Sequence, residues 1–153
     1  MEKLPDEFYC LLGRIVYFSN LYDNYLLHAN NYKNKAESER KGLGQKIIEF
    51  EPIFNEKHKK TCAAQYPKYD FIAQLKMANK IRKMYVHGIP FMYGDKITSM
   101  KITQEIIDNN GDAKPEQLKG YTLPDLRKIV IGFQGLLDVM SYLLDSDLPR
   151  KSP

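Results

Sequence analysis

The 153-residue sequence lacks a long apolar run, since no segment approaches the roughly eighteen consecutive apolar residues of a membrane-spanning helix. Its first seven residues carry charges and a proline in place of an apolar leader. We therefore expect a soluble, cytoplasmic protein with no membrane partner. A chain of this length can bury a hydrophobic core, and we expect a single domain over residues 1–153.

The residues that build metal centres and nucleotide sites are also scarce. The two cysteines, Cys10 and Cys62, do not form a Cys-x2-Cys pair, and none of the three histidines belongs to a His-Glu-x2-His pattern. Gly42-Leu43-Gly44 lacks the spacing and the Lys-Ser/Thr ending of a phosphate-binding loop. We expect reduced structural thiols, no metal and no cofactor, and nucleotide hydrolysis is disfavoured.

Positive charge is present, and it is concentrated in the middle of the sequence. Residues 33–83 hold thirteen lysines and arginines against six aspartates and glutamates, whereas the net charge of the whole chain is only +4. A surface for nucleic acid explains this segment, and so does the solvated lysine face of an ordinary helical protein. The sequence alone favours neither explanation.

Apolar residues recur at helical spacing in four segments. The first extends from about Asp6 to Asn31. The second has Ser38 as its expected N-cap, and Pro52 should bend or break it. The third starts near Asp70 and stops around Gly88, and the last follows an N-cap at Thr122. The stripes are Phe8, Leu11, Leu12, Ile15, Phe18, Tyr22, Tyr25, Leu26 and Ala29; Leu43, Ile47, Phe50 and Phe54; Ile72, Leu75, Ala78, Ile81 or Arg82, and Tyr85; Leu126, Ile129, Val130, Phe133, Leu136, Leu137, Met140, Leu143 and Leu144.

The connections between these segments are polar. Residues 55–68 are basic and include the run Lys57-His58-Lys59-Lys60, which either contacts RNA phosphates or forms a solvated loop. Turn residues Gly94-Asp95 border a β-tolerant stretch, so a small β-hairpin insertion is expected near 91–103. The predicted fold class is all-α: a helical bundle of four principal helices with this insertion.

The pattern with the most chemical content is Arg82-Lys83-Met84-Tyr85-Val86-His87, where a helix ends before Gly88. Arg82 keeps its charge and matches phosphate oxygens, and His87 can accept or donate a proton near neutrality. On RNA, His87 could deprotonate a ribose 2′-hydroxyl while Arg82 stabilises the charge on the phosphorus, without a metal. The simpler alternative is that His87 complements the dipole at the helix end.

Residues five apart on an ideal helix point about 140° away from each other, so this pair does not share one face. The two side chains can converge if the last turn tightens or unwinds at Gly88, or if a second copy of the chain completes the site across a two-fold interface. Tyr85, between them, either packs in the core or stacks on a base; we favour the core.

The Arg-x4-His motif at the end of an amphipathic helix, followed directly by Gly88 in a helical protein, resembles the higher eukaryotes and prokaryotes nucleotide-binding (HEPN) superfamily. The resemblance extends over about residues 6–145. It implies a small helical bundle that forms a homodimer and cleaves RNA as a metal-independent endoribonuclease, used as a toxin or in phage defence. It assigns Arg82 and His87 as the catalytic residues, and an antitoxin or nucleotidyltransferase protein as the partner that silences the activity.

Lys83 departs from the superfamily pattern, which more often has an asparagine after the arginine. A lysine there can contact an RNA phosphate while cleavage is slowed or lost. The alternative function is therefore a non-catalytic RNA-binding or protein-interaction module of the same type. In an enzyme, Arg82 and His87 should open into a basic groove at a dimer interface, whereas in an interaction module they should be apart, packed or salt-bridged.

Overall fold

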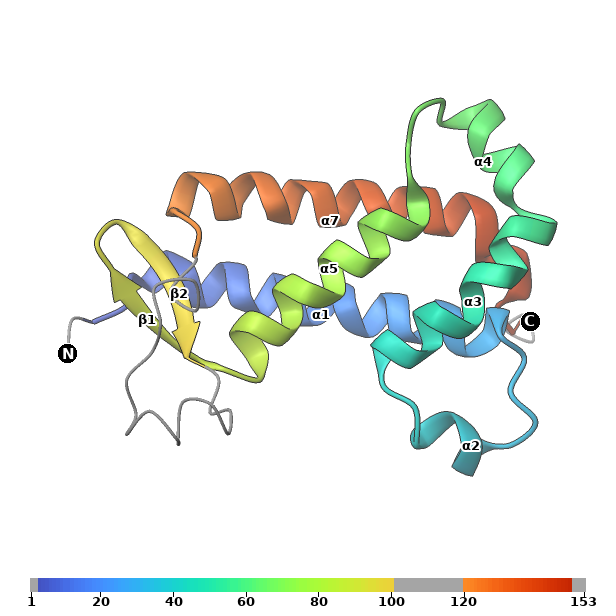
Figure 1. Cartoon of the computed structure of the whole chain (residues 1–153), viewed down its shortest axis with the longest axis horizontal. Coiled ribbons are helices and arrows are strands. Elements are labelled where there is room, and N and C mark those ends of the chain that lie inside the picture. The colour runs from blue at the N-terminus through green and yellow to red at the C-terminus, as the bar shows by residue number, and fades with distance from the viewer. Residues whose placement is uncertain (1–2, 101–119, 150–153) are drawn as a thin grey trace. The chain divides into compact units, whose positions relative to one another are not determined.

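The structure is a computed structural model that describes residues 3–100 and 120–149. This part of the chain is mostly helical and contains one two-stranded antiparallel hairpin (Figure 1). The elements are α1 (Asp6–Ala29), α2 (Lys35–Glu39), α3 (Leu43–Lys57), α4 (Lys59–Gln65), α5 (Phe71–Val86), β1 (Ile89–Tyr93), β2 (Lys96–Met100), α7 (Leu123–Leu144) and the 3-10 turn η2 (Asp145–Asp147). The four helical segments expected from apolar spacing correspond to α1, α3, α5 and α7.

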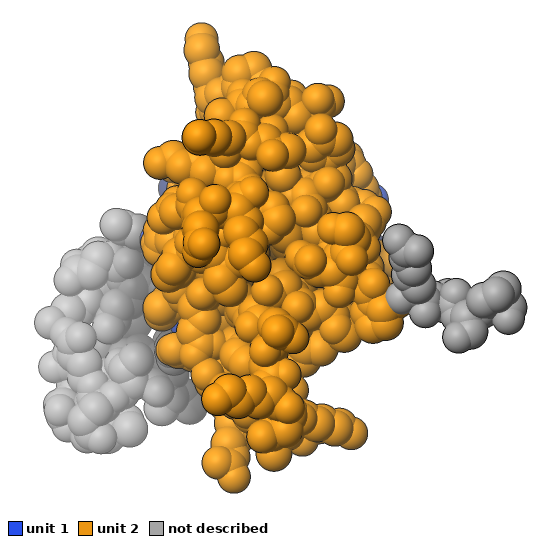
Figure 2. All heavy atoms as spheres, turned by 90° about the vertical axis from the view of Figure 1, so that its right-hand side faces the viewer, with its two compact units in different colours: residues 1–16, 80–132 blue, residues 17–79, 133–153 orange. Residues whose placement is uncertain are grey.

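The chain divides into two compact units, which Figure 2 colours separately. Unit 1 comprises residues 1–16 and 80–132, and unit 2 comprises residues 17–79 and 133–153. Helices α1, α5 and α7 each contribute one part to each unit. Each unit is described by itself below.

The core of unit 1 is formed where the first part of α1 meets the end of α5, the hairpin and the start of α7. Phe8 and Tyr85 pack edge to face, with ring centroids 5.4 Å apart. Arg127 forms a two-point ion pair with Glu7 at the surface of the same unit. The buried apolar side chains of the unit are Phe8, Leu11, Ile15, Ile81, Tyr85, Ile97, Leu126 and Val130.

The core of unit 2 is larger and rich in aromatic rings. The Tyr22 hydroxyl donates a hydrogen bond to the backbone carbonyl of Phe133 at 2.5 Å, and the rings of Phe54 and Phe71 stack at 5.3 Å. Burial of an apolar side chain of this size contributes about 1.5–3 kcal/mol. The buried apolar side chains include Phe18, Tyr22, Leu26, Leu43, Ile47, Phe50, Phe54, Phe71, Leu75, Phe133, Met140 and Leu144.

By length and composition, one described segment, Leu123–Asp147, is apolar enough to cross a membrane. Core helices of soluble proteins meet the same criterion, and α7 buries Leu126, Val130, Phe133, Leu136 and Met140 within the protein.

The second helical segment differs from expectation at Pro52 and at Ser38. Of the bend or break expected at Pro52, the break does not occur, since α3 runs through Pro52 to Lys57. An interior proline costs a helix about 3 kcal/mol, but the buried rings of Phe50 and Phe54 lie on either side of Pro52 and hold the helix in place. Ser38 does not cap α3 either, because it lies inside the short helix α2, and Gly42 occupies the N-cap position of α3.

The expected hairpin is confirmed, with β1 and β2 spanning residues 89–100; residues 101–103 lie outside the described part of the chain. Tyr93 pairs with Lys96, so Gly94 and Asp95 form a two-residue turn. Gly94 has φ of +63°, a conformation in which glycine carries no steric penalty. Two residues separate the end of α5 at Val86 from the start of β1 at Ile89, so the hairpin lies next to the end of the helix along the chain.

Candidate functional site at the end of helix α5

Local sequence explains where α5 begins and ends. The Asp70 carboxylate accepts a hydrogen bond from the backbone N–H of Ala73 at 3.1 Å, which caps the N-terminus. The last helical residue is Val86, and Pro90 prevents further helix soon after Gly88. The buried apolar side chains of α5 are Phe71, Ile72, Leu75, Ala78, Ile81 and Tyr85. Apolar spacing predicted this stripe without Phe71 and left Ile81 or Arg82 open; the structure buries Ile81 and leaves Arg82 half-buried.

Tyr85 fixes the last turn of α5 in the core of unit 1. Its hydroxyl donates a hydrogen bond to the carbonyl of Ile97 in β2 at 2.7 Å, and its side chain is only 2% exposed. Burial raises the pKa of Tyr85 well above its ordinary value, so the hydroxyl stays protonated and remains a donor. The interpretation of Tyr85 as a core residue is confirmed, and its ring is not accessible for stacking on a base.

Gly88 lets the chain leave the helix close to the hairpin. A Cβ atom at this position would lie 1.7 Å from Oγ of Ser99 in β2 and 2.7 Å from the carbonyl oxygen of Met84. Only glycine fits so close to these atoms without displacing them. Tyr85 and Gly88 therefore hold the two residues between them, Val86 and His87, at a defined place on the surface.

Arg82, Lys83 and His87 are all accessible at this end of the helix. Lys83 and His87 are exposed, and Arg82 is half-buried. Within the described residues, the structure shows no hydrogen bond or ion pair from any of these three side chains. The arrangement thus differs from one in which both candidate catalytic groups are packed or salt-bridged.

The end of α5 does not unwind enough to bring Arg82 and His87 onto one face. The backbone N–H of His87 still donates to the carbonyl of Lys83 at 3.2 Å, which continues the helical hydrogen-bond pattern to His87. Their directions therefore remain about 140° apart. The last turn therefore does not unwind before His87, and within one chain the two side chains do not converge. A second copy of the chain is the remaining way to bring an Arg82 and a His87 together.

His87 instead shares its helical face with two lysines. Lys80, Lys83 and His87 are spaced i, i+3 and i+7, so they lie along one side of α5, and all three are exposed. No carboxylate pairs with them in the described part of unit 1. On this side of the helix end, Lys80 and Lys83 can attract an anion, and the His87 imidazole beside them can exchange a proton with it.

The basic run at 57–60 is placed on helices and not in a loop. Lys57 ends α3, Lys59 and Lys60 begin α4, and His58 lies at the junction between them. All three lysines are exposed. Burial lowers the pKa of the half-buried His58, so this histidine adds little positive charge to the run near neutral pH.

The remaining histidine, His28, is half-buried near the end of α1, away from His87 in sequence and in the other unit. Among the residues that the structure describes, no three histidine, cysteine, aspartate or glutamate side chains are grouped so that they could hold a metal ion. Cys62 is buried, and burial raises the pKa of its thiol, whereas Cys10 is exposed.

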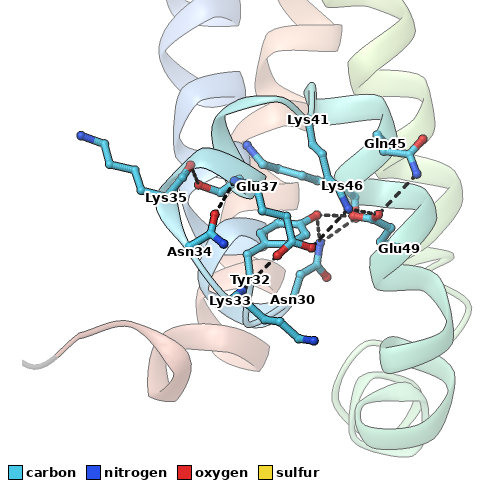
Figure 3. Close-up of polar contacts among 11 residues, drawn as sticks. Asn30, Tyr32, Lys33, Asn34, Lys35, Glu37, Lys41, Gln45, Lys46 and Glu49 are labelled. Atoms are coloured by element: carbon cyan, nitrogen blue, oxygen red, sulfur yellow. Dashed lines mark hydrogen bonds and ion pairs between the residues drawn. The ribbon is translucent and has the colours of Figure 1, made fainter.

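A polar network around Glu49 in unit 2 was not predicted from the sequence (Figure 3). The Glu49 carboxylate accepts hydrogen bonds from Tyr32 and, at 2.5 Å, from Lys41. Asn30 donates to the Tyr32 hydroxyl and to the Lys46 carbonyl, each at 3.0 Å. The i, i+4 spacings of Glu37 with Lys41 and of Gln45 with Glu49 were readable signals, whereas Tyr32, Lys41 and Glu49 come from separate parts of the sequence.

The network perturbs the groups that form it. Hydrogen bonds from Lys41 and then Tyr32 lower the pKa of Glu49 below its ordinary value of 4.5. Burial, followed by the hydrogen bond to Glu49, raises the pKa of Tyr32 to about 12. Close by, the nearly buried Lys46 ammonium donates to Asp23 at 2.8 Å. The charged side chains of this network are therefore paired with one another within unit 2.

Comparison of the chain with protein-family models, with curated proteins and with solved structures found no match.

Proposed function

We propose that this chain is a metal-independent endoribonuclease of HEPN type, with Arg82 and His87 as its catalytic residues. In this proposal α1, α3, α5 and α7 are the four helices of one bundle-like domain over residues 1–153. The protein acts as a cytoplasmic homodimer, as a toxin or phage-defence effector, and an antitoxin or nucleotidyltransferase protein silences it.

The observation that carries the proposal is the availability of the two side chains. Arg82 and His87 have no partner in the described part of the chain, and His87 projects from a helix end that Tyr85 and Gly88 fix in place. Positioned but unpartnered charges suit a group that acts on a ligand. Because the two side chains leave α5 in different directions, the proposal requires that Arg82 of one chain and His87 of another form each site.

The chemistry follows from the ordinary properties of these groups. His87 takes the proton of a ribose 2′-hydroxyl, the 2′-oxygen bonds to the adjacent phosphorus, and the bond to the 5′-oxygen breaks as that oxygen gains a proton. Arg82 stabilises the additional negative charge on the phosphate oxygens. Lys83 contacts a neighbouring phosphate. DNA is not cleaved, because it lacks the 2′-hydroxyl.

A non-catalytic RNA-binding or protein-interaction module is the second candidate, and two observations favour it. Arg82 and His87 point apart within one chain, as expected of such a module, and position 83 is a lysine. The superfamily more often has asparagine at this position, and a lysine supports binding of phosphate without a role in orienting the reacting groups.

The first experiment incubates the purified protein with end-labelled single-stranded RNA in EDTA, beside Arg82→Ala and His87→Ala variants that circular dichroism shows to be folded. We expect cleavage by the wild type and its loss in both variants. RNA that is bound in a gel shift but left intact would overturn the catalytic proposal and favour a binding module. RNA that is neither cut nor bound would favour protein interaction.

A complementation experiment tests the shared site. Equal amounts of the Arg82→Ala and His87→Ala chains are mixed and allowed to exchange subunits. If each site takes one residue from each chain, half of the dimers regain one complete site, and about a quarter of the wild-type activity returns. If both residues act within one chain, no activity returns, because every site lacks one of them.

A further inference from the structure

A hollow of about 430 Å³ lies in unit 2, where the end of α3, helix α4 and the start of α5 meet. Phe54 and Phe71, whose rings stack at 5.3 Å, are both buried and belong to its lining. Tyr66 and Tyr69 also line the hollow; both are half-buried, and their ring centroids are 6.3 Å apart. The size and the aromatic lining suit a small planar group.

The charged residues that line this hollow balance one another, with Lys59 and Lys68 against Glu51 and Asp70, and the excess of positive charge comes from the lysines around it. Glu51 pairs with one of these, Lys76, at 3.3 Å, and Asp70 caps α5. Lys59 and Lys68 line the same hollow, both are exposed, and the structure shows no carboxylate bound to either within its described residues. The neighbouring Lys57 and Lys60 are exposed too, and Glu56 is the only acidic residue between 55 and 69.

The backbone at Lys68 is unusual. Its φ is +66°, the left-handed region that glycine or asparagine occupies most easily. A lysine at this position costs folding free energy relative to glycine, and no contact of its ammonium within the described structure offsets that cost. The side chain is thus kept at the rim of the hollow against the local backbone preference.

We propose that this hollow binds one nucleotide of single-stranded RNA, with the base against Tyr66 and Tyr69 and the flanking phosphates on Lys59 and Lys68. Aromatic faces with lysines beside them are the usual means of holding an unstacked base and its backbone. The inference rests on the proposed function, which makes RNA the substrate, and adds a second contact that is separate from Arg82 and His87. The lysines around the hollow favour an anionic occupant over a peptide with few acidic residues or an apolar peptide.

The test measures binding of a fluorescently labelled single-stranded 12-nucleotide RNA by anisotropy, in a His87→Ala background so that the RNA remains intact. We expect Lys59→Gln with Lys68→Gln to raise Kd by about tenfold and to reduce the slope of log K against log salt by about 1.4, for two lost phosphate contacts. The matched control is Lys33→Gln with Lys128→Gln, which removes the same charge from exposed lysines outside the hollow. An equal change in both pairs, or no change in the first, would overturn the proposal.

Lys68→Gly separates binding from folding. Glycine relieves the left-handed backbone, so the melting temperature should rise while the RNA affinity falls. A rise in melting temperature with unchanged affinity would show that Lys68 has no part in binding.

Failure of this inference is distinct from failure of the proposed function. If the wild type cleaves RNA in EDTA and the Lys59/Lys68 variant binds RNA as tightly as its background, RNA does not bind in the hollow and the catalytic proposal stands. If nothing is cleaved but the variant still loses affinity, RNA binding in the hollow is supported and the catalytic proposal is not. A wild type that does not bind RNA overturns both.

Discussion

The network around Glu49 and the end of α5 both hold several charged side chains, but they use them in opposite ways. Around Glu49, the ammonium groups of Lys41 and Lys46 and the hydroxyl of Tyr32 all have acceptors within the fold. At the end of α5, Arg82, Lys83 and His87 have none in the described part of the chain. Charges of the first kind should matter for stability, and charges of the second kind for binding and chemistry.

The largest effect of a substitution is expected at the end of α5, on the rate of RNA cleavage. His87→Ala should lower the rate of RNA cleavage by about 10²–10⁴-fold through loss of the proton acceptor. The free energy of unfolding should stay within about 0.5 kcal/mol of the wild type, because His87 is exposed. Single-turnover cleavage in EDTA and urea denaturation measure the two quantities. His28→Ala is the control and should leave the cleavage rate unchanged; a destabilisation of His87→Ala as large as that of a core variant would contradict the comparison.

The next largest effect should come from the paired region. Asp23→Ala leaves the ammonium of Lys46, whose side chain is 4% exposed, without its partner. We expect a loss of about 2–3 kcal/mol, below the usual cost for a fully buried pair because Asp23 is itself 39% exposed and water reaches it. Urea denaturation measures the loss. The exposed Asp138, which accepts a hydrogen bond from Gln134 at 3.1 Å, supplies the control Asp138→Ala. Equal losses in the two variants would show that the buried pair has no special role.

Glu49 gives a smaller effect with a defined pH dependence. Its pKa is lowered in the folded protein, so the unfolded chain takes up the proton first as pH falls. The stabilisation is therefore complete above the ordinary value of 4.5 and is lost as pH falls through the folded pKa.

Glu49→Gln should cost about 1 kcal/mol at neutral pH and should flatten the loss of stability as pH falls below the ordinary value of 4.5. Urea midpoints at several pH values measure both. Glu39→Gln changes an exposed carboxylate whose partner among the described residues is Lys35, at 3.6 Å on the surface, and it should alter neither quantity. If Glu49→Gln loses stability with falling pH as steeply as the wild type does, the role given to Glu49 is refuted.

The smallest effect is expected at Lys83. Lys83→Asn should change the free energy of unfolding by less than about 0.5 kcal/mol, because the side chain is exposed and has no partner in the described structure. It should also reduce the slope of log K against log salt for single-stranded RNA by about 0.7, as one phosphate contact is lost. Lys128→Asn is the control, and an unchanged slope at Lys83 would remove its assigned contact.

Much of the fold could be predicted because helices and turns depend on local pattern. Apolar spacing located α1, α5 and α7, and Thr122 caps α7 as expected, with its hydroxyl accepting from the backbone N–H of Asp125 at 3.2 Å. Gly94-Asp95 located the turn of the hairpin. Pro52 does not break α3, because packing of Phe50 and Phe54 outweighs a local preference. Ser38 is not a cap, because it lies inside the short helix α2, whose N-cap is Asn34.

The sequence by itself determined the helical segments, the hairpin turn and the order of Arg82, Lys83 and His87, because these depend on neighbours along the chain. Only the tertiary structure decided which charges are used within the fold and which remain available. Lys46 meets Asp23, and Tyr32 and Lys41 meet Glu49, through contacts between residues separated by 8 to 23 positions. No local pattern encodes such meetings, since packing of the helices brings the side chains together.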